Sequence, residues 1–366
     1  DAGGNRYLDL GAGIAVNALG YGRKDLAKIA SKQMRKLIHI SNLYATAPAI
    51  DLAGLLIEVT RGRVNEFAAV QFGNSGAEAN EAALKYARLY AHRTRGPGHH
   101  KILSMSNGFH GRTMGALSAT PNRKYAEPFE PLVPDMLSSG YNDSGQLEAV
   151  LNDSFAGVIV EVVQGEGGLR PMTPEFAQAL NRVCRENDII LIADEVQTGL
   201  GRTGKLFGSE LVGLEPDIVT FSKPLAGGLP LSATMIPKRI NDVLHPGDHG
   251  TTFGGGPVTA SVAAHVVRTI SDPEFLARVA ERGARLTELL DELVTTKHEV
   301  VERRGVGMLQ GLAIAPPTGA GEGTADGTAD GTADASGRVA EIMNACRDRG
   351  VLLLRSSSNV VRIAPP

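Results

Sequence analysis

Short apolar runs alternate with helical patterns through the middle of this chain, and this alternation limits the fold more than any other feature. Residues 158–163 and 189–193 are largely apolar, and residues 217–221 look like a third such run. Between the first two, a cap residue and a proline precede apolar residues that share one helical face; these are Thr173, Pro174, Phe176, Leu180, Val183 and Cys184. Strands that alternate with helices form a mostly parallel sheet flanked by helices, so the sequence predicts an α/β fold.

A second, smaller unit is expected near the end of the chain. Asp272 and Pro273 begin a long amphipathic pattern that continues to about Val294 and leads into a shorter C-terminal region. We therefore expect a large domain over residues 46–265. Both remaining parts of the chain, residues 1–45 and 266–366, are expected to build a smaller α+β domain.

Three tandem Gly-Thr-Ala-Asp units occupy residues 323–334, within a stretch rich in Gly, Thr and Asp at 318–337. This composition, without apolar periodicity, is typical of a flexible surface loop. A calcium-binding repeat is the alternative, and the small number of carboxylate ligands argues against it.

The charge and cysteine content exclude several classes of function. The formal net charge is −3 and no dense Lys/Arg run occurs, so neither a nucleic acid nor a membrane surface is indicated as a partner. No apolar stretch reaches the roughly 18–20 residues that cross a bilayer. The two cysteines, Cys184 and Cys346, are too few for a disulfide framework or a metal cluster, and they fit a reducing compartment. We expect a cytoplasmic protein with no metal. Both ends of the sequence are abrupt, which suggests a fragment trimmed at both termini, and the mitochondrial matrix stays an alternative if a transit peptide is among the trimmed parts.

Asp194 follows directly after the apolar run 189–193. Ligands of open α/β sheets bind beyond the carboxyl ends of the strands, so this carboxylate is expected to face the crevice. A buried carboxylate needs a partner, and a protonated pyridine nitrogen would serve. From its position alone, a cap on a neighbouring turn is an equally good interpretation.

The sequence around Asp194 resembles a known family. Residues 194–204, Asp-Glu-Val-Gln-Thr-Gly-Leu-Gly-Arg-Thr-Gly, match the signature of the class III (ornithine/acetylornithine-type) aminotransferases at all its fixed positions. Lys223 follows in Thr-Phe-Ser-Lys-Pro-Leu-Ala-Gly-Gly-Leu-Pro. The resemblance covers nearly the whole chain and implies a fold type I enzyme that uses pyridoxal 5'-phosphate (PLP). It also implies that Lys223 carries PLP as a Schiff base and that Asp194 pairs with the ring nitrogen.

A phosphate site is expected at the start of a helix. Ser75 and Glu78 form a capping-box pattern, and the free backbone N–H groups of Gly76 and Ala77 would meet a phosphate at the favourable end of the helix dipole. A cap with no ligand is the alternative for such a pattern. The resemblance of residues 75–80 to the family motif Ser-Gly-Ala/Thr-Glu-Ala-Asn favours the phosphate site.

Further cofactor contacts are implied by the resemblance alone. The family stacks Phe109 on the pyridine ring, and it places Val196 and Gln197 against the ring face and the phenolic oxygen. Thr252 matches a threonine that reaches the phosphate of the neighbouring subunit, which implies a homodimer with a shared active site. The loop departs from the family pattern at Gly256, where asparagine is usual.

The substrate residues are also assigned by resemblance. Arg112 matches the arginine that grips a substrate carboxylate, and Glu166 and Arg362 match a pair that acts as a switch. Glu166 would neutralise Arg362 while a terminal amine reacts, and the α-carboxylate of 2-oxoglutarate would then displace it. Tyr44 is a candidate wall of the substrate pocket, although a lone aromatic is more often core. Val162 stands where the family usually has proline.

The expected reaction is transfer of the terminal amine of N-acetylornithine to 2-oxoglutarate. Residues 13–20 and 41–44, together with His110, resemble the acetylornithine aminotransferase subgroup. Ornithine, succinylornithine, carrier-bound lysine and GABA are alternative amino donors for the same chemistry. A PLP racemase or decarboxylase, or a non-catalytic relative, remains a further alternative, although the retained Lys223, Asp194 and Glu166 argue against these.

Overall fold

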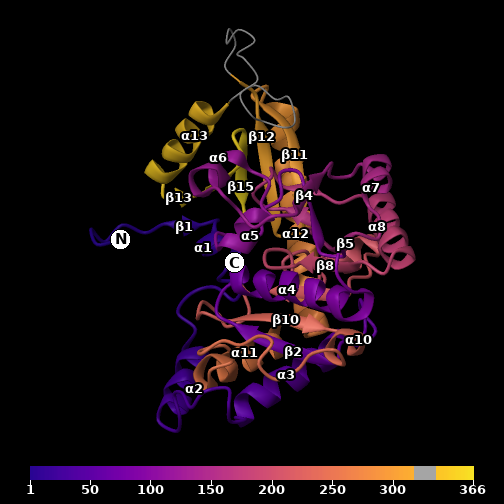
Figure 1. Ribbon diagram of the computed structural model, residues 1–366. Coiled ribbons are helices and arrows are strands. Elements are labelled where there is room, and N and C mark those ends of the chain that lie inside the picture. The colour runs from indigo at the N-terminus through magenta and orange to yellow at the C-terminus, as the bar shows by residue number, and fades with distance from the viewer. Residues whose placement is uncertain (317–334) are drawn as a thin grey trace.

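The computed structural model describes residues 1–316 and 335–366, and Figure 1 shows how their helices and strands are arranged. The three Gly-Thr-Ala-Asp units lie outside the described residues. A seven-stranded sheet forms the centre of the molecule, in the order β2 (Ala69–Gly73), β10 (Ser232–Ile236), β9 (Ile218–Phe221), β8 (Ile190–Asp194), β5 (Phe155–Val160), β3 (Lys101–Met105) and β4 (Met136–Ser139).

This sheet is mainly parallel, as predicted. Strand β10 runs antiparallel to both of its neighbours, and the pairs β9–β8, β8–β5, β5–β3 and β3–β4 are parallel. The three strands expected from the apolar runs are present as β5, β8 and β9. The first ends earlier than expected, at Val160, so that Glu161 lies beyond the strand.

Alternate residues of the central strands enter two different hydrophobic clusters, because successive strand side chains point to opposite faces. Helix α4 (Gly76–Arg95) covers one face, packing Ala83 and Tyr86 against Ile192. The other face is covered by α3 (Ala47–Thr60), α8 (Pro174–Glu186) and α11 (Pro257–Ile270). The result is a sheet between two helical layers, which buries both faces of the inner strands.

The helix boundaries follow the predicted caps. The Oγ1 atom of Thr173 accepts a hydrogen bond from the backbone N–H of Phe176 at the start of α8. Asp272 accepts the N–H groups of Glu274 and Phe275 at the start of α12 (Pro273–Thr296). The shorter helices are α1 (Ala12–Ala15), α5 (Met114–Ser118), α6 (Arg123–Ala126), η1 (Glu127–Phe129), α7 (Ser144–Val150), α9 (Ser209–Val212) and α10 (Lys238–Asn241).

A second, four-stranded sheet is built from the C-terminal part of the chain. Strands β11 (Val300–Val306), β12 (Leu309–Ile314), β15 (Val360–Ile363) and β14 (Leu354–Ser356) form an antiparallel sheet with α12 and α13 (Ser336–Asp348) beside it. The N-terminal β1 (Leu8–Asp9) pairs with β13 (Val351–Leu352). In contrast, α2 (Lys24–Met34) packs on α11 in the core of the central sheet. The division at residues 45 and 265 stays a prediction, and α2 lies with the larger unit.

Three glycines lie where residues 194–204, which match the family signature, meet the second sheet and α12. We call Gly204, Gly283 and Gly307 the glycine seam. A Cβ atom added at Gly204 would lie 3.1 Å from the Cβ of Ala280 on α12. One added at Gly307, in the β11–β12 turn, would lie 2.7 Å from the backbone of Thr203, and one at Gly283 would lie 2.8 Å from Gly307 itself. The backbones of the two units therefore touch at this seam, with no room for side chains between them.

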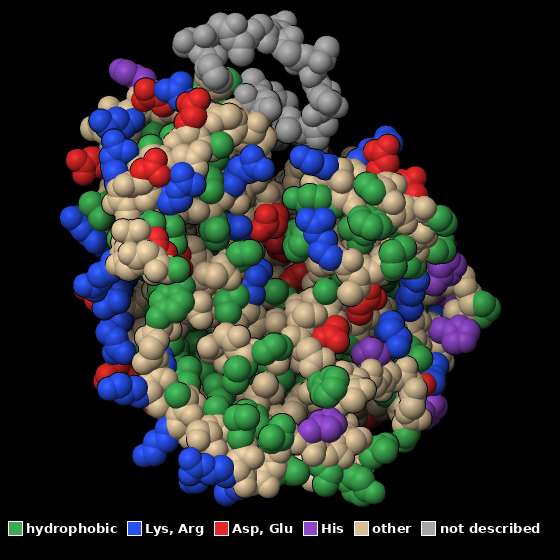
Figure 2. Space-filling model, turned by 90° about the vertical axis from the view of Figure 1, so that its left-hand side faces the viewer, with side chains coloured by type: hydrophobic (Ala, Val, Ile, Leu, Met, Phe, Trp, Pro, Cys, Tyr) green, Lys and Arg blue, Asp and Glu red, His purple; other side chains and the backbone are tan. Residues whose placement is uncertain are grey.

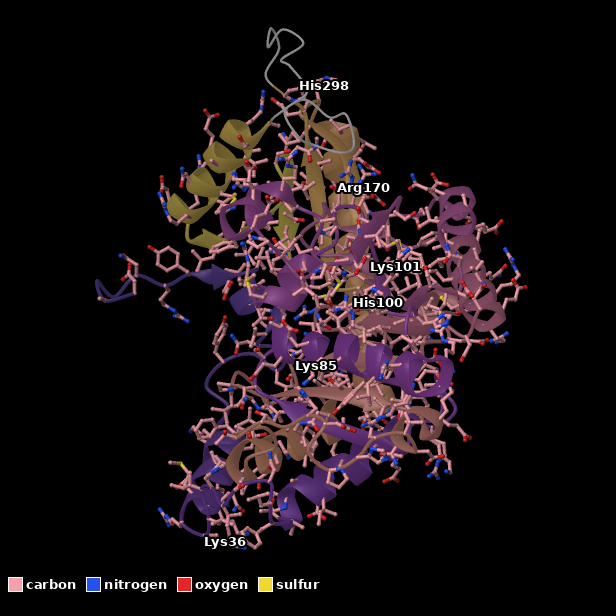
Figure 3. The ribbon with its side chains drawn as sticks, in the orientation of Figure 1. Lys36, Lys85, His100, Lys101, Arg170 and His298 are labelled. Carbon is pink, nitrogen blue, oxygen red and sulfur yellow. The ribbon has the colours of Figure 1, made fainter. Side chains whose placement is uncertain are left out.

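Within the part of the chain that the structure describes, no helix combines the length and apolar composition that a membrane span requires. In the same residues, no group of three or more His, Cys, Asp and Glu side chains is arranged to hold a metal ion. Figure 3 shows that side chains fill the space between the helices and strands. Lys85, labelled there on α4, is exposed and so lies on the side of the helix that faces away from the sheet.

Candidate active site

The candidate site lies where the strand order reverses. The chain passes from β3 outward to β4 and then returns across β3 to form β5, after which β8 and β9 continue in the opposite direction. The loops that follow β3 and β5 diverge at this point and leave a crevice at the carboxyl ends of the strands. Residues 107–112 and 161–168 occupy these loops, and they include the predicted contacts Phe109, Arg112 and Glu166.

Asp194 is the last residue of β8 and is only 4% exposed. Its Oδ2 atom accepts hydrogen bonds from Asn80 Nδ2 at 2.7 Å and from His110 Nδ1 at 2.8 Å. Its Oδ1 atom accepts the backbone N–H of Val196 at 3.1 Å. Three donors directed at one carboxylate engage both of its oxygens, so the floor of the crevice holds a buried and hydrogen-bonded carboxylate.

Asn80 organises this floor. Its amide also donates to the backbone oxygen of His110 at 2.7 Å, and its Oδ1 atom accepts from Thr220 Oγ1 at 2.7 Å. Thr220 is the residue on β9 that pairs with Asp194 on β8. Asn80 lies four residues after Gly76 on α4, so it faces the same side as the helix start. Neither Asn80 nor Thr220 was predicted to have a role, although an Asn on the alanine-rich face of this helix was a usable signal.

Lys223 lies two residues after β9, beside this floor. Burial lowers the pKa of its amine, the charge of Arg362 lowers it further, and the charge of Asp194 opposes the shift. A lower pKa leaves more of the amine unprotonated near neutral pH, which a nucleophilic or proton-transferring lysine requires.

This shift predicts selective chemical modification of the apoprotein. A small amine-directed carbonyl reagent at mildly alkaline pH should modify Lys223 before the exposed Lys205, because a free lysine titrates only near pH 10.4. Peptide mapping after partial modification would measure the two rates. Equal rates would show that the amine of Lys223 keeps an ordinary pKa.

The start of α4 is built as a cradle. Ser75 Oγ accepts the N–H of Glu78 at 3.3 Å, which confirms the predicted cap, and the Glu78 carboxylate accepts the N–H of Asn74 at 2.6 Å. A Cβ atom added at Gly76 would lie 2.7 Å from Val196 Cγ1. Only glycine therefore fits between the helix start and Val196, and Gly76 and Ala77 remain at the positive end of a 20-residue helix.

The loop after β3 presents Phe109 and Arg112. Glu161 accepts the backbone N–H of Phe109 at 2.9 Å, and the Phe109 ring meets the edge of Tyr125 at 6.3 Å between centroids. The guanidinium carbon of Arg112 lies 3.7 Å from the centre of the Tyr125 ring and 5.5 Å from that of Phe109. Arg112 is exposed and held by these aromatic rings, which leaves its N–H groups directed to solvent or to a carboxylate.

Glu166 and Arg362 meet as the sequence analysis expected. Arg362 Nη1 lies 2.6 Å from Glu166 Oε1, and it also donates to the backbone oxygen of Gly165 and to Gln197 Oε1, both at 3.2 Å. The Arg362 side chain is 4% exposed, whereas that of Glu166 is 30% exposed. The arginine is thus fixed on β15, and the glutamate is the partner with room to move.

Two predicted residues lie away from this cluster in the single chain. Tyr44 is 65% exposed, and Thr252 is also exposed. A hydrogen bond of 2.9 Å from Asn42 Nδ2 to the backbone oxygen of Thr251 brings their two segments together at the surface. Both segments therefore lie at the surface of the single chain.

The two departures from the family pattern have little local effect. The backbone of Gly256 has φ −51°, and a Cβ atom there would meet nothing closer than 3.4 Å, so this position does not depend on glycine. Val162 is buried, and its carbonyl oxygen accepts the N–H of Met172 at 2.8 Å. Both turns are held without the usual asparagine and proline.

These groups fit PLP. The buried anion Asp194 matches a protonated ring nitrogen, the amine of Lys223 matches the aldehyde, and the cradle at Gly76 matches the phosphate. Val196 and Phe109 flank the space between them on separate loops. The Nε atom of Arg362 and the Nε2 atom of His110 are buried without a partner among the described residues, and unpaired buried polar atoms of this kind are compatible with a ligand site.

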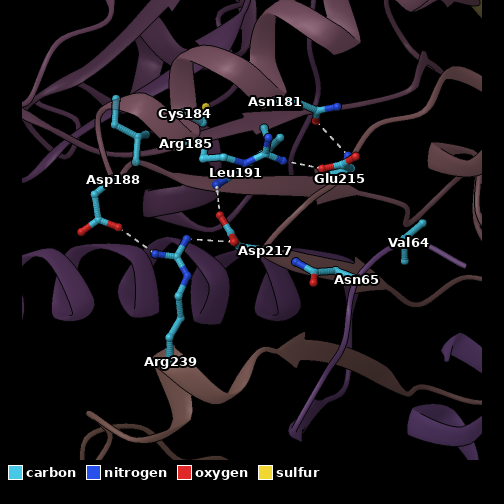
Figure 4. A pocket seen from close by; sticks show the side chains of 11 residues that line it. Val64, Asn65, Asn181, Cys184, Arg185, Asp188, Leu191, Glu215, Asp217 and Arg239 are labelled. Atoms are coloured by element: carbon cyan, nitrogen blue, oxygen red, sulfur yellow. Dashed lines mark hydrogen bonds and ion pairs between the residues drawn. The ribbon is translucent and has the colours of Figure 1, made fainter. Parts of the chain in front are cut away.

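A separate cavity of about 450 Å³ lies at the opposite ends of the strands, before β8 and β9 begin. Figure 4 shows that its charged groups are already paired: Arg239 lies 2.7 Å from Asp188 and 2.8 Å from Asp217, and Arg185 bonds to Glu215. The polar groups of this cavity satisfy one another, so it is not the candidate active site.

The sheet order, the half-buried lysine beside a buried aspartate, and the helix-start cradle define a fold type I PLP enzyme. The whole chain, residues 1–366, matches the family described as Aminotransferase class-III. The protein belongs to the class III aminotransferases.

Named relatives and solved structures agree with this assignment. The chain is 41% identical to a probable mitochondrial acetylornithine aminotransferase from Dictyostelium discoideum, over the whole chain and 77% of that protein. It is also 41% identical to an acetylornithine aminotransferase from Caldanaerobacter subterraneus, over the whole chain and 86% of that protein. A PLP-bound amine transaminase from an uncultivated Pseudomonas species superposes with a TM-score of 0.90 at 30% identity, covering the whole chain and 87% of that structure.

Proposed function

We propose that this aminotransferase moves the terminal amine of N-acetylornithine to 2-oxoglutarate, giving N-acetylglutamate semialdehyde and glutamate. The observation that carries the proposal is the 2.6 Å pair of Glu166 and Arg362 in the same crevice as Lys223 and Asp194. The relatives named above are acetylornithine aminotransferases. A solved N-acetylornithine aminotransferase from Stenotrophomonas maltophilia has a TM-score of 0.81 to this chain at 29% identity, covering the whole chain and 86% of that structure.

The residues of the floor hold the cofactor and move the proton. When bound, PLP supplies an electron sink for the carbon that loses its proton. Asp194 would hold the ring nitrogen, and the N–H groups at Gly76 and Ala77 would hold the phosphate. The Lys223 amine, whose pKa is lowered by burial, can then take the proton from the substrate carbon and return it at the neighbouring position.

The switch follows from the unequal burial of its two members. A substrate that reacts through its terminal amine brings no carboxylate beside the reacting carbon, so Glu166 stays on Arg362 and neutralises it. When 2-oxoglutarate reacts, its α-carboxylate takes the place of Glu166, which can swing toward solvent because it is the more exposed partner. Arg112, at the mouth of the crevice, would bind the distal carboxylate of either substrate.

The switch can be tested by replacing Glu166 with alanine. Arg362 would then attract any α-carboxylate, so donors that react at the α-amine should gain about tenfold in kcat/KM relative to N-acetylornithine, which corresponds to about 1.4 kcal/mol. Glu148→Ala, which removes an exposed glutamate from α7, is the matched control. An unchanged ratio of the two donor classes would remove Glu166 from the switch.

A homodimer belongs to the same proposal. Leu43, Tyr44 and Phe253 are 87%, 65% and 66% exposed, and the ring of Phe253 lies 5.4 Å from that of His39. Figure 2 shows hydrophobic side chains gathered over one face of the molecule around a hollow that holds charged side chains. A second copy placed against the Tyr44 and Thr252 segments would cover the exposed side chains of Leu43 and Phe253. It would also bring Thr252 to the phosphate bound by the partner subunit.

Phe253→Glu is therefore expected to weaken the dimer at least about 30-fold, because a central aromatic anchor contributes about 2 kcal/mol or more. Sedimentation of the holoprotein over a range of concentrations would measure the change. Phe129→Glu is the control, since Phe129 is also exposed, at 57%, but lies on η1 and away from residues 38–44 and 251–253 in the sequence. If Phe253→Glu sediments like the wild type and keeps its cofactor, the proposed interface is wrong.

The amino donor is tested by single half-reactions. Each candidate amine is added without 2-oxoglutarate, and the loss of the visible absorbance of bound PLP is followed. N-acetylornithine should react faster than ornithine, succinylornithine or GABA. If one of these reacts faster, the protein is an aminotransferase of that other donor.

The relatives' names include mitochondrial and bacterial enzymes, so the cytoplasm and the mitochondrial matrix are both compatible with this function.

A further inference from the structure

A buried carboxylate beside the active site has no role in the function proposed above. Glu161 lies one residue beyond β5 and is 6% exposed. Val160 on β5 pairs with Ala193 on β8, so Glu161 and Asp194 leave adjacent parallel strands at the same level. Two buried carboxylates in neighbouring positions repel each other, and such a pair is stable only if a proton or a cation compensates one of the charges.

His110 stands between these two carboxylates. Its Nδ1 atom is 2.8 Å from Asp194 Oδ2, while its Nε2 atom is buried without a partner among the described residues. A Cβ atom added at Gly108 would lie 3.2 Å from His110 Nε2 and 3.7 Å from Glu161 Oε2. The free ring nitrogen and the carboxylate oxygen thus face the same small space. These two atoms form no hydrogen bond in this structure, so the proton passes between them through one bridging water or after a rotation of either side chain.

We propose that Glu161 and His110 share one proton in this space, so that Glu161 is a positioning residue that acts on the cofactor through Asp194. The proton moves from the Glu161 carboxyl oxygen to His110 Nε2: the O–H bond breaks and the N–H bond forms. A carboxylic acid and a neutral imidazole thereby become a carboxylate and an imidazolium. In both forms the three side chains carry one net negative charge, and Asp194 stays ionised.

The charges around Glu161 agree with this arrangement. Burial raises the pKa of the Glu161 carboxyl, the charge of Asp194 raises it further, and the charge of His110 opposes the shift. The hydroxyl of Tyr141 donates to the Glu161 backbone oxygen at 2.9 Å, and burial raises the pKa of that hydroxyl well above its usual value, so Tyr141 stays neutral. Toward Lys223, a charged Glu161 raises the pKa of the amine against the effect of burial.

Glu161 also joins the two loops that line the crevice. Its Oε2 atom accepts the N–H of Phe109 at 2.9 Å, and its Oε1 atom accepts the N–H of Gly165 at 3.2 Å. Gly165 in turn offers its carbonyl oxygen to Arg362 at 3.2 Å. Removal of the side chain would therefore disturb both loops as well as the charge. Glu161→Gln is the better test, because it keeps the size and one acceptor while removing the proton exchange.

The first experiment uses the apoprotein, so it does not depend on the proposed function. In protein labelled with ¹⁵N-histidine, the His110 Nε2 shift should lie between the values of a bare and a protonated nitrogen, and the His110→Gln spectrum assigns the signal. In Glu161→Gln the midpoint of the His110 titration should fall by about one pH unit, because the opposite charge is lost. Glu148→Gln should leave it unchanged. A bare Nε2 with the same midpoint in all three proteins would overturn the proposal.

The second experiment uses the holoprotein and rests on the proposed PLP function. The pH midpoint of the visible absorbance of bound PLP should fall by about one unit in Glu161→Gln, because a negative charge near the cofactor is removed. In the His110→Gln background, Glu161→Gln should produce no further shift of this midpoint. In the wild-type background, Glu161→Asp should shift the midpoint less than Glu161→Gln does. Equal shifts in both backgrounds would show that Glu161 acts without His110, which overturns the shared proton.

The outcomes of the two experiments are distinguishable. If the apoprotein shows the shared proton but the chain binds no PLP, the proposed function fails and the Glu161–His110 pair stands. If Glu161→Gln does not fold, the Nε2 shift of the wild-type apoprotein decides alone, since a bare nitrogen excludes sharing.

Discussion

Replacing Lys223 with alanine is expected to lower the rate of transamination by about 10⁴-fold, the upper range for the loss of an acid–base group. The amine of Lys223 lies beside the buried Asp194 and has a lowered pKa, so it is the group suited to carry the proton. Rapid mixing of the PLP-loaded variant with N-acetylornithine, followed as a single turnover, would measure the loss directly. The visible absorbance that depends on a covalent link to this lysine should also disappear.

The control for this substitution is Lys205→Ala, which removes an exposed lysine directly after the signature residues 194–204. It should keep both the absorbance and the turnover. A Lys223→Ala protein that retains a tenth of the wild-type rate would show that another group moves the proton.

Asp194→Asn is expected to lower kcat by about 10²–10³-fold, the cost of removing one fixed electrostatic partner from an active site. Asparagine has the same size, so the hydrogen bond from Asn80 and the fold should survive. The charge that would keep the ring nitrogen protonated is lost, and PLP affinity should fall as well. Equilibrium dialysis of PLP, together with kcat measured at saturating PLP, separates the two effects.

Asp242→Asn is the matched control, because Asp242 is an exposed carboxylate in an i,i+4 pair on the surface. A normal kcat in Asp194→Asn at saturating PLP would mean that Asp194 only helps to bind the cofactor. Recovery of kcat in Asp194→Glu would show how strictly the position of the charge matters.

Much of the fold follows from local signals in the sequence. The strand that ends in Asp194 and the helix that begins after Thr173 were predictable, because apolar runs and caps are written in neighbouring residues. The packing of α2 on the central sheet was not, since its partner α11 lies more than 200 residues later in the chain. Antiparallel β10 was likewise not expected, because strand direction depends on the connection and not on the strand's own residues.

The site shows the same limit. Glu166 and Arg362 were paired only through a resemblance, and the structure brings them to 2.6 Å across 196 residues of sequence. The hydrogen bonds of Asn80 to Asp194 and Thr220 had no local signature, because each partner comes from a different strand or helix. Tyr44 and Thr252 remain predictions: Tyr44 is expected to line the substrate pocket, and the contact expected of Thr252 lies in a second copy of the chain.

The glycine seam between the signature run and the second sheet has a consequence for engineering this enzyme. Gly204, Gly283 and Gly307 bind no substrate, but each leaves no space for even a methyl group without moving a neighbouring backbone. A saturation library would therefore find three intolerant positions remote from the substrate. Their substitutions would displace α12 or the β11–β12 turn. Because β12 pairs with β15, which carries Arg362, loss of donor selectivity would precede loss of cofactor in such variants.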